Sequence, residues 1–186
     1  MPNVIYSMSV SLDGYIAGPD GSFDWSAPDE ELHRFHNERV RALSAQLMGR
    51  NLYETMLYWE REDESRDTVS REFAEIWRAL PKIVFSTTLE SVEGNTRLAT
   101  GGVADELARL DGDVGLGGAG LAAGCIELVD QVEPFVYPVI VGGGTPFLPP
   151  LDHRIDLELL ETRTFGSRVT HLRYRRRSAP SPERTG

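Results

Sequence analysis

The chain has 186 residues, 40% hydrophobic and 26% charged, so it can fold around a sizeable core without disulfides or structural metals. Its net charge of −10 argues against non-specific binding to nucleic acid or anionic membranes, and no apolar run is long enough to span a bilayer. The single cysteine, Cys125, excludes an internal disulfide, and its apolar neighbours favour a buried, unreactive thiol. Because the first residues lack the pattern of a secretory signal, we expect a cytoplasmic protein.

The first third of the chain alternates strand and helix signals. Residues 4–12 have β-rich composition and stop at Asp13-Gly14, after which a loop continues to about residue 27. Apolar residues at helical spacing predict a helix at 29–43 with one buried stripe. A short strand at 46–49 stops at a glycine, and a short helix at 51–57 follows it.

The same alternation continues to the end of the chain. Every residue of 60–67 is charged or carries a hydroxyl, which is typical of an exposed loop, and the next helix, 69–80, ends before Pro81. Two strands, a helix, a strand, a helix and three strands are then expected, in this order: 82–85, 96–99, 103–110, 114–116, 121–128, 132–141, 155–164 and 169–174.

This order of elements predicts the fold class. Strands that alternate with helices over the first 130 residues indicate parallel β-α-β units with helices on both faces. The last three strands have no helices between them, so they should add antiparallel pairs at one edge. The predicted architecture is a three-layer α/β/α fold with a mixed, mostly parallel central sheet. We expect one domain over residues 1–175 and a flexible C-terminal tail at 176–186.

Three strand ends carry groups suited to a phosphate. Gly117-Gly118-Ala119-Gly120-Leu121 opens a helix, where free backbone N–H groups attract an anion; a tight turn that needs positive φ is the alternative. Gly49-Arg50-Asn51 adds a guanidinium, although a lone arginine also fits a solvated surface. The hydroxyls of Ser86-Thr87-Thr88 either donate to phosphate or cap a turn. Because ligands of open α/β sheets bind at the carboxyl ends of strands, these ends together predict one site.

These motifs, in this order, resemble the dihydrofolate reductase-like superfamily, which includes the reductase domain of bacterial riboflavin biosynthesis. The resemblance covers roughly residues 3–175 and rests on Ser11-Leu12-Asp13-Gly14-Tyr15-Ile16-Ala17, Trp25, Met48-Gly49-Arg50, Ser86-Thr87, Gly117-Gly118-Ala119-Gly120 and Val141-Gly142-Gly143-Gly144-Thr145-Pro146. It implies an NADPH-dependent reductase of a small planar heterocycle, pterin- or pyrimidine-like, assembled as a homodimer with segment 135–140 as a candidate interface. The alternative is a non-catalytic nucleotide-, pterin- or flavin-binding regulatory protein on the same fold.

The resemblance also implies which residues hold the cofactor. Ser9 and Ile16 would contact its nicotinamide half. Arg50 and Thr87 would lie near the adenosine 2′-phosphate, with Ser86 beside them. All of these residues lie on the first strand, the loop after it, or the strand ends described above.

The resemblance also implies a role for the glycine turn, and the sequence departs from the usual pattern at two positions. Gly117-Gly118 would lie along the pyrophosphate, commonly with a cis peptide between the glycines. Leu52 stands where dihydrofolate reductases usually have threonine, and Leu116 where riboflavin-type reductases usually have glutamate. The zinc-binding deaminase motif that often accompanies such reductases is absent from the sequence.

Reduction of a heterocycle also needs a proton source. Alignment on Trp25 puts Glu30 at the place of the dihydrofolate reductase carboxylate, with Asp29 beside it. Both acids equally fit the start of a helix, where the helix dipole favours them. Asp13 is open between a chemical role and capping of its own loop.

The remaining candidates are aromatic residues and histidines. Loop 18–28 carries Phe23 and Trp25 and is either a mobile lid or, at Trp25, core packing. The same choice between pocket wall and core applies to the helical set Tyr53, Met56 and Trp59. The four histidines have no metal-ligand pattern, so no metal site is predicted, and His33 and His36 are expected on the surface of an acidic helix.

Overall fold

The structure is a computed structural model that describes residues 2–177. Its strands are β1 (Asn3–Ser11), β2 (Tyr15–Ala17), β3 (Ala45–Gly49), β4 (Lys82–Phe85), β5 (Thr96–Leu98), β6 (Asp113–Gly117), β7 (Gln131–Tyr137), β8 (Thr145–Pro146), β9 (Leu157–Thr164) and β10 (Thr170–Arg176). Its helices are α1 (Glu30–Arg41), α2 (Arg50–Glu60), α3 (Thr68–Ala79), α4 (Val103–Leu107) and α5 (Ala119–Cys125), with short 3₁₀ turns η1 (Asp24–Ser26) and η2 (Ile126–Leu128).

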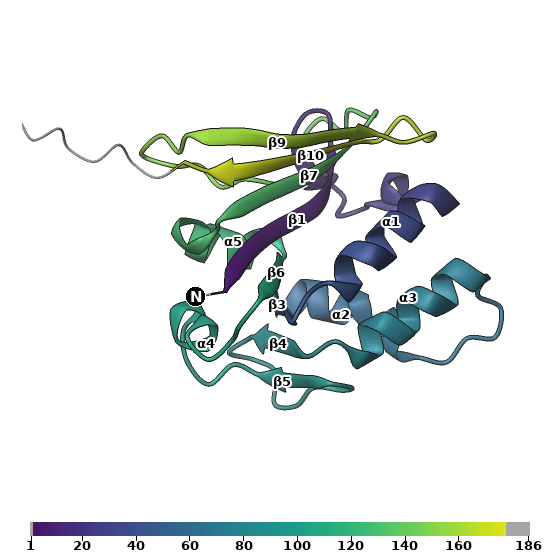
Figure 1. Ribbon diagram of the computed structural model, residues 1–186, viewed down its shortest axis with the longest axis vertical. Coiled ribbons are helices and arrows are strands. Elements are labelled where there is room, and N and C mark those ends of the chain that lie inside the picture. Colours follow the sequence, from purple (N-terminus) through teal and green to yellow (C-terminus); the bar gives the residue numbers. More distant parts are fainter. Residues whose placement is uncertain (1, 178–186) are drawn as a thin grey trace, which may run out of the picture.

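Eight strands form one central sheet in the order β5-β4-β3-β6-β1-β7-β10-β9. Helices α1, α2 and α3 lie on one side of it and α4 and α5 on the other (Figure 1). The predicted three-layer α/β/α fold with a mixed, mostly parallel sheet is therefore confirmed.

The sheet is parallel from β5 across to β7. Strand β10 pairs antiparallel with both β7 and β9, so the expected antiparallel edge exists. The first of these three strands, β7, also lies parallel to β1 and so joins the antiparallel edge to the parallel part of the sheet. The chain crosses over through α5 between β6 and β7, and such a crossover returns the next strand in the same direction.

Several local expectations are corrected. The loop after β1 contains β2, which pairs with the two-residue β8; strands this short carry no periodicity that a sequence can reveal. Helix α2 runs on to Glu60, so that residue is not part of the predicted exposed loop. Arg66 in that loop is buried, with its guanidinium over Tyr58 and Trp59 at 4.6 and 5.2 Å from the ring centroids. The thiol of Cys125 is buried as expected, and burial raises its pKa to about 11.

The face of β1 toward α1 carries small polar side chains. Ser9 lies beside Phe135 in the β1–β7 register, and the Phe135 ring contacts α1, so Ser9 and, by strand alternation, Ser7 point to this face. Both serines are only partly buried although β1 lies at the centre of the sheet. Solvent therefore reaches the middle of the sheet beside α1.

The C-terminal strand extends further than expected. β10 ends at Arg176, and the backbone N–H of Arg177 donates to Asp156, so the first residues of the expected tail are held in the sheet. The rest of that tail, 178–186, lies outside the described residues. Within residues 2–177, no helix has the length and apolar character needed to cross a membrane.

Candidate functional site

The three predicted phosphate motifs lie together at one edge of the sheet. In the register, Met48 is the partner of Gly117, and Gly49 is the partner of Phe85. A Cβ built on Gly118 would lie 3.9 Å from the backbone nitrogen of Gly49, so the glycine turn and the start of α2 are in close approach. The carboxyl ends of β3, β4 and β6 thus form one continuous rim.

An open cavity of about 630 Å³ lies on this rim and is lined by Arg50, Phe85, Ser86, Thr87, Thr88, Ala99, Thr100 and Gly101. The Arg50 guanidinium donates from Nε to Glu54 at 2.7 Å and from Nη1 to the Thr88 hydroxyl at 2.8 Å. Ser86 Oγ accepts from the backbone N–H of Thr88 and of Leu89, at 3.2 and 3.1 Å. Ser86 therefore caps the turn, while Thr88 positions the arginine.

Thr100 and Gly101 complete the cavity wall but carried no signal in the sequence. Glu106, whose side chain is 0% exposed, holds this wall by accepting from the Thr100 backbone N–H at 2.7 Å and from Arg97 at 2.5 Å. The hydrogen bond from Arg97 is the largest cause that lowers the pKa of Glu106 to about 2, and the Thr100 N–H adds to it. The rim is thus fixed by a buried carboxylate that stays ionised in the folded protein.

The glycine turn at the end of β6 is shaped by Leu52. Gly118 has a φ of +91°, in the left-handed region, and precedes α5. The described residues contain no cis peptide bond, so the expected cis peptide between Gly117 and Gly118 is not found. The Leu52 side chain occupies the space that a Cβ on Gly117 would need. Leu52, which stands where the resemblance leads one to expect threonine, therefore packs on the turn.

The predicted nicotinamide contacts lie on different elements. Ser9 is on the α1 face of β1, and burial raises the pKa of Tyr137, a shift that Ser9 opposes. Ile16, on β2, packs against the core cluster that contains Tyr6 and Phe147 on the opposite face. The structure therefore places Ser9 on the face of the sheet toward α1 and the side chain of Ile16 on the opposite face.

Asp13 closes the loop after β1. Its carboxylate accepts from the backbone N–H of Val141 at 3.1 Å and of Gly142 at 2.8 Å. The hydrogen bond with Ser11 is the largest cause that lowers the pKa of Asp13, and these backbone contacts add to it. The sequence left Asp13 open between a chemical role and loop capping, and its contacts in the structure are those of loop capping.

The two acids proposed as proton sources also have local partners. Asp29 caps α1 by accepting from the Leu32 backbone N–H at 2.9 Å. Glu30 pairs with Arg34 at 2.6 Å, and its side chain is 72% exposed. Both contacts are those of an ordinary helix start, and the catalytic role of these acids stays a prediction.

Trp25 has features of both predicted roles, the aromatic lid and core packing. Its ring packs edge-on against Tyr137 with centroids 5.6 Å apart, which is core packing. Its indole nitrogen Nε1 is buried and has no hydrogen-bond partner among residues 2–177. Phe23, two residues earlier, is about half exposed. An indole N–H without a partner is a donor available to a ligand.

The histidines of α1 are not on the surface, so that expectation is wrong. The ring of His33 packs against Trp59 and Phe73, with centroids 5.9 and 5.6 Å away. The ring of His36 lies over Phe135 at 4.4 Å. Both belong to the stripe that α1 turns toward the sheet and its neighbouring helices. Tyr53, Met56 and Trp59 are core residues or pack against the core.

Below α1, β7 and β10 hold a buried polar cluster. Glu133 and His171 both have side chains that are 0% exposed. Glu133 Oε2 pairs with Arg39 of α1 and lies 3.4 Å from His171 Nε2. No sequence motif links these three residues, which are far apart along the chain.

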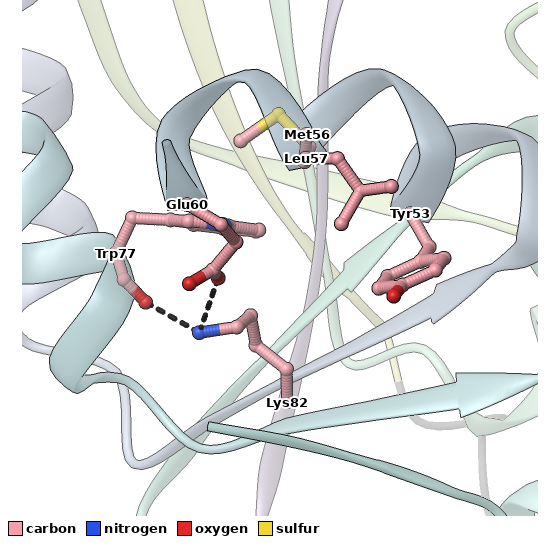
Figure 2. A pocket seen from close by; sticks show the side chains of 6 residues that line it. All are labelled: Tyr53, Met56, Leu57, Glu60, Trp77 and Lys82. Atoms are coloured by element: carbon pink, nitrogen blue, oxygen red, sulfur yellow. Dashed lines mark hydrogen bonds and ion pairs between the residues drawn. The ribbon is translucent and has the colours of Figure 1, made fainter. Parts of the chain in front are cut away.

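A second hollow, lined by residues of α2, α3 and β4, has no room for a water molecule, and Figure 2 shows the side chains that line it. Its charged group is the buried Lys82, whose ammonium donates to the backbone oxygens of Trp77 and Leu80 at 2.6 and 2.9 Å and lies 3.2 Å from Glu60. Burial is the main cause that lowers the pKa of Lys82. Because its donors are satisfied by the end of α3, this lysine ties helices to the sheet rather than offering a ligand site.

Comparisons with known proteins give a matching family model and a curated relative. The model of the RibD C-terminal domain family matches residues 2–171. YyaP, an uncharacterized protein of Bacillus subtilis (strain 168), is 28% identical over 178 residues, covering 92% of this chain and 93% of YyaP.

Solved structures show the same fold. A protein from Shewanella sp. PV-4, provisionally assigned by name to riboflavin biosynthesis, has a TM-score of 0.75 at 22% identity, covering 96% of this chain and 100% of that one. Dihydrofolate reductase from Enterococcus faecalis, solved with NADP(H) and RAB-propyl, has a TM-score of 0.63 at 20% identity, covering 95% of this chain and 97% of that one.

Proposed function

The chain belongs to the RibD C-terminal domain family, and from this premise we propose that it is an NADPH-dependent reductase of a small planar heterocycle, pterin- or pyrimidine-like. The observation that carries the proposal is the open cavity at the strand ends, where Arg50 lies among the hydroxyls of Ser86, Thr87, Thr88 and Thr100. A guanidinium with neighbouring hydroxyl donors is the donor set that a phosphate monoester requires. The solved reductases of the same fold support this assignment.

The residues present fit the cofactor. Arg50, with Ser86 and Thr87, would hold the 2′-phosphate, and Asn51 lies beside them at the start of α2. The pyrophosphate would follow Gly117-Gly118 and the start of α5 at Ala119, Gly120 and Leu121, where a Cβ built on Gly120 would meet nothing within 4 Å. NADPH supplies a hydride, and Ser9 would bound its nicotinamide; the contact predicted for Ile16 would not come from its side chain, which packs on the opposite face of the sheet.

A non-catalytic protein that binds a nucleotide, pterin or flavin is the second candidate. It is favoured by the engagement of Asp29 in a helix cap and of Glu30 in an exposed ion pair. Ligand binding without consumption of NADPH, measured with candidate pterins and pyrimidines, would select it over the reductase.

We also propose a homodimer in the cytoplasm. Of the predicted interface 135–140, Phe135 and Tyr137 are buried, whereas Ile140 is 71% exposed. Leu12 is 65% exposed, and its N–H donates to Val139, so the two apolar side chains belong to one region of the surface. Sedimentation equilibrium tests the assembly.

The proposed function is tested by titrating the protein with NADPH and, separately, NADH, following energy transfer from tryptophan to the nicotinamide. Micromolar NADPH binding with weaker NADH binding is expected. Arg50→Ala should weaken NADPH by about 1 to 3 kcal/mol and NADH much less, because only NADPH carries the extra phosphate. Arg71→Ala, at an exposed arginine of α3, is the matched control. An equal loss for both cofactors would show that Arg50 does not read the 2′-phosphate.

A further inference from the structure

The face of β7, β10 and β9 that points away from α1 is left open to solvent. On the α1 side of β10, His171 is fully buried against Phe135, so its neighbour Leu172 points to the other face by strand alternation. Leu172 is only partly buried, although β10 lies between two strands. Helix α5, on that side of the sheet, packs on β6 and β3 instead (Figure 1). We call this open surface the outer face.

The strand register assigns the residues of the outer face. Tyr174 is the partner of Val132 on one side and of Leu159 on the other, and Val132 belongs to the core cluster of this face. The uncharged side chains that remain partly or fully exposed here are Pro134, Val136, Leu159, Thr162, Leu172 and Tyr174. Leu159 alone is 53% exposed. A contiguous apolar surface of this kind is typical of a contact between proteins.

Most charged residues of the same strands lie on the opposite face. Glu133 and Arg163 are both on the α1 side, beside His171. Arg176, at one end of the outer face, is neutralised by an ion pair with Glu127. The chain carries a net charge of −10, so two copies repel one another unless they meet through an uncharged surface. Because a two-fold contact uses the same surface twice, the outer face is complementary to a second copy of itself.

The free edge of the sheet is less suited to a second copy than its outer face. Arg173 pairs with Glu161, and Tyr174 pairs with Leu159, so Leu160 is an extra residue in the edge strand β9. A bulge of this kind twists an edge strand and hinders pairing with another strand. The second copy should therefore pack face to face rather than extend the sheet.

We propose that the outer face is the surface through which two copies of this chain pack together. The inference rests on the proposed homodimer and names its contact surface. The face has a bulky end at the paired Leu159 and Tyr174 and a small end at the paired Thr164 and Thr170. A two-fold axis across the strands lays the bulky end of each copy on the small end of the other, so that the side chains interdigitate.

The size of the surface adds a neighbouring segment to the contact. Three strands of seven residues have a flat extent of roughly 300 Å². A stable interface takes about 800 Å² from each partner. Leu148 and Leu151, 44% and 42% exposed, follow Phe147, which stacks on Tyr6 on the same side of the sheet. These two leucines would enlarge the contact beyond the strands.

The test is sedimentation equilibrium of the full chain. Leu159→Glu puts a charge on the outer face at an exposed position of the edge strand, and Leu12→Glu is the matched control in another apolar region, since Leu12 is 65% exposed. We expect a wild-type dimer, a dissociation constant at least about tenfold higher for Leu159→Glu, and a change within about twofold for Leu12→Glu. Circular dichroism verifies that each variant is folded.

A double variant tests the contact between the two ends. Leu159→Glu combined with Thr164→Lys places opposite charges across the two-fold axis. Within one chain the two positions are roughly 15 Å apart along β9, too far to form an ion pair. Dimerisation should therefore recover severalfold relative to Leu159→Glu alone.

The outcomes separate this inference from the proposals beneath it. An unchanged dimer in Leu159→Glu, an equal loss in Leu12→Glu, or no recovery in the double variant would overturn the inference, while the homodimer proposal stands on the wild-type dimer. A wild type that stays monomeric at every concentration would remove the homodimer proposal and the inference with it. The titration with NADPH tests the reductase proposal independently of both.

Discussion

The two flanks of β1 differ in how far their ion pairs are exposed to solvent. On the open flank, formed by β6, β3, β4 and β5, Arg50 and Glu54 pair at the mouth of a cavity, with side chains 48% and 43% exposed. On the closed flank, formed by β7, β10 and β9 under α1, Glu133 pairs with Arg39 and is 0% exposed. Each pair joins an arginine to a glutamate, so the difference lies in solvent access.

Solvent access decides what each pair can do. An exposed ion pair contributes roughly 0 to 1 kcal/mol, because water and salt screen it, so Arg50 can exchange Glu54 for another anion at little cost. A buried carboxylate that loses its partner keeps its desolvation penalty and has no water to replace the contact. We infer that the open flank is arranged for exchange with a ligand and the closed flank for a fixed structure.

The largest expected effect tests the closed flank. Glu133→Gln removes the buried charge while keeping the side chain's shape, so Arg39 loses its ionic partner and His171 its contact with a carboxylate. We expect the free energy of unfolding to fall by about 2 to 3 kcal/mol, measured by urea denaturation. NADPH affinity should change less than twofold, because the cavity is on the other flank.

Glu161→Gln is the control for that change, since Glu161 lies on β9 of the same flank but is partly exposed and 3.5 Å from Arg173. It should alter stability by less than about 0.5 kcal/mol. If Glu133→Gln lost NADPH binding as well as stability, the distinction between a ligand-binding flank and a structural flank would be wrong, because both flanks would then belong to one site.

The open flank could be predicted from the sequence because its groups belong to local motifs. Gly49-Arg50, Ser86 and Gly117-Gly118 each follow a strand directly, and parallel strands bring their carboxyl ends to one edge. The contacts between side chains within the cavity could not be predicted from the sequence. Thr88 was assigned to a hydroxyl cluster without its contact to Arg50, because a side-chain rotamer is decided by packing.

The closed flank escaped prediction because its contacts join distant parts of the chain. Glu133 meets Arg39 across 94 residues and His171 across 38, and no motif marks either pair. The spacing of His36 and Arg39 with Leu32 on α1 was the available signal, since all three lie on one helical stripe. His36 in that stripe was predicted on the surface, although a stripe can bury polar groups when they pack against the opposing strand.

The open flank also contains a buried carboxylate, that of Glu106. Glu106 has a folded pKa of about 2, below its unfolded value, so its contribution is present above about pH 4.5 and is lost as pH falls toward 2. Glu106→Gln should therefore destabilise the protein by about 2 kcal/mol at pH 7 and by much less near pH 2, measured by urea denaturation.

Glu106→Gln should also weaken NADPH binding severalfold at pH 7, because an amide has one acceptor oxygen and cannot hold both Thr100 and Arg97 as the carboxylate does. Glu38→Gln, at an exposed glutamate of α1, controls for the change in net charge. A stability difference between wild type and Glu106→Gln that stays constant from pH 7 to pH 2 would show that the charge of Glu106 contributes nothing.

The smallest expected effect sharpens the comparison at the exposed pair itself. Glu54→Gln keeps an oxygen that can accept from Arg50 Nε, now 2.7 Å from the carboxylate, but removes the negative charge beside the proposed phosphate site. Through solvent, one charge removed at several ångströms corresponds to about 0.6 kcal/mol, so NADPH should bind about threefold tighter and NADH unchanged, with unfolding unaffected. Fluorescence titration at low and high salt measures this, and the gain should shrink with salt. Glu75→Gln on α3 is the control. Weaker NADPH binding in Glu54→Gln would mean that the carboxylate orients Arg50 for the phosphate. The exposed Arg50–Glu54 pair would then have a structural role, as the buried Arg39–Glu133 pair does.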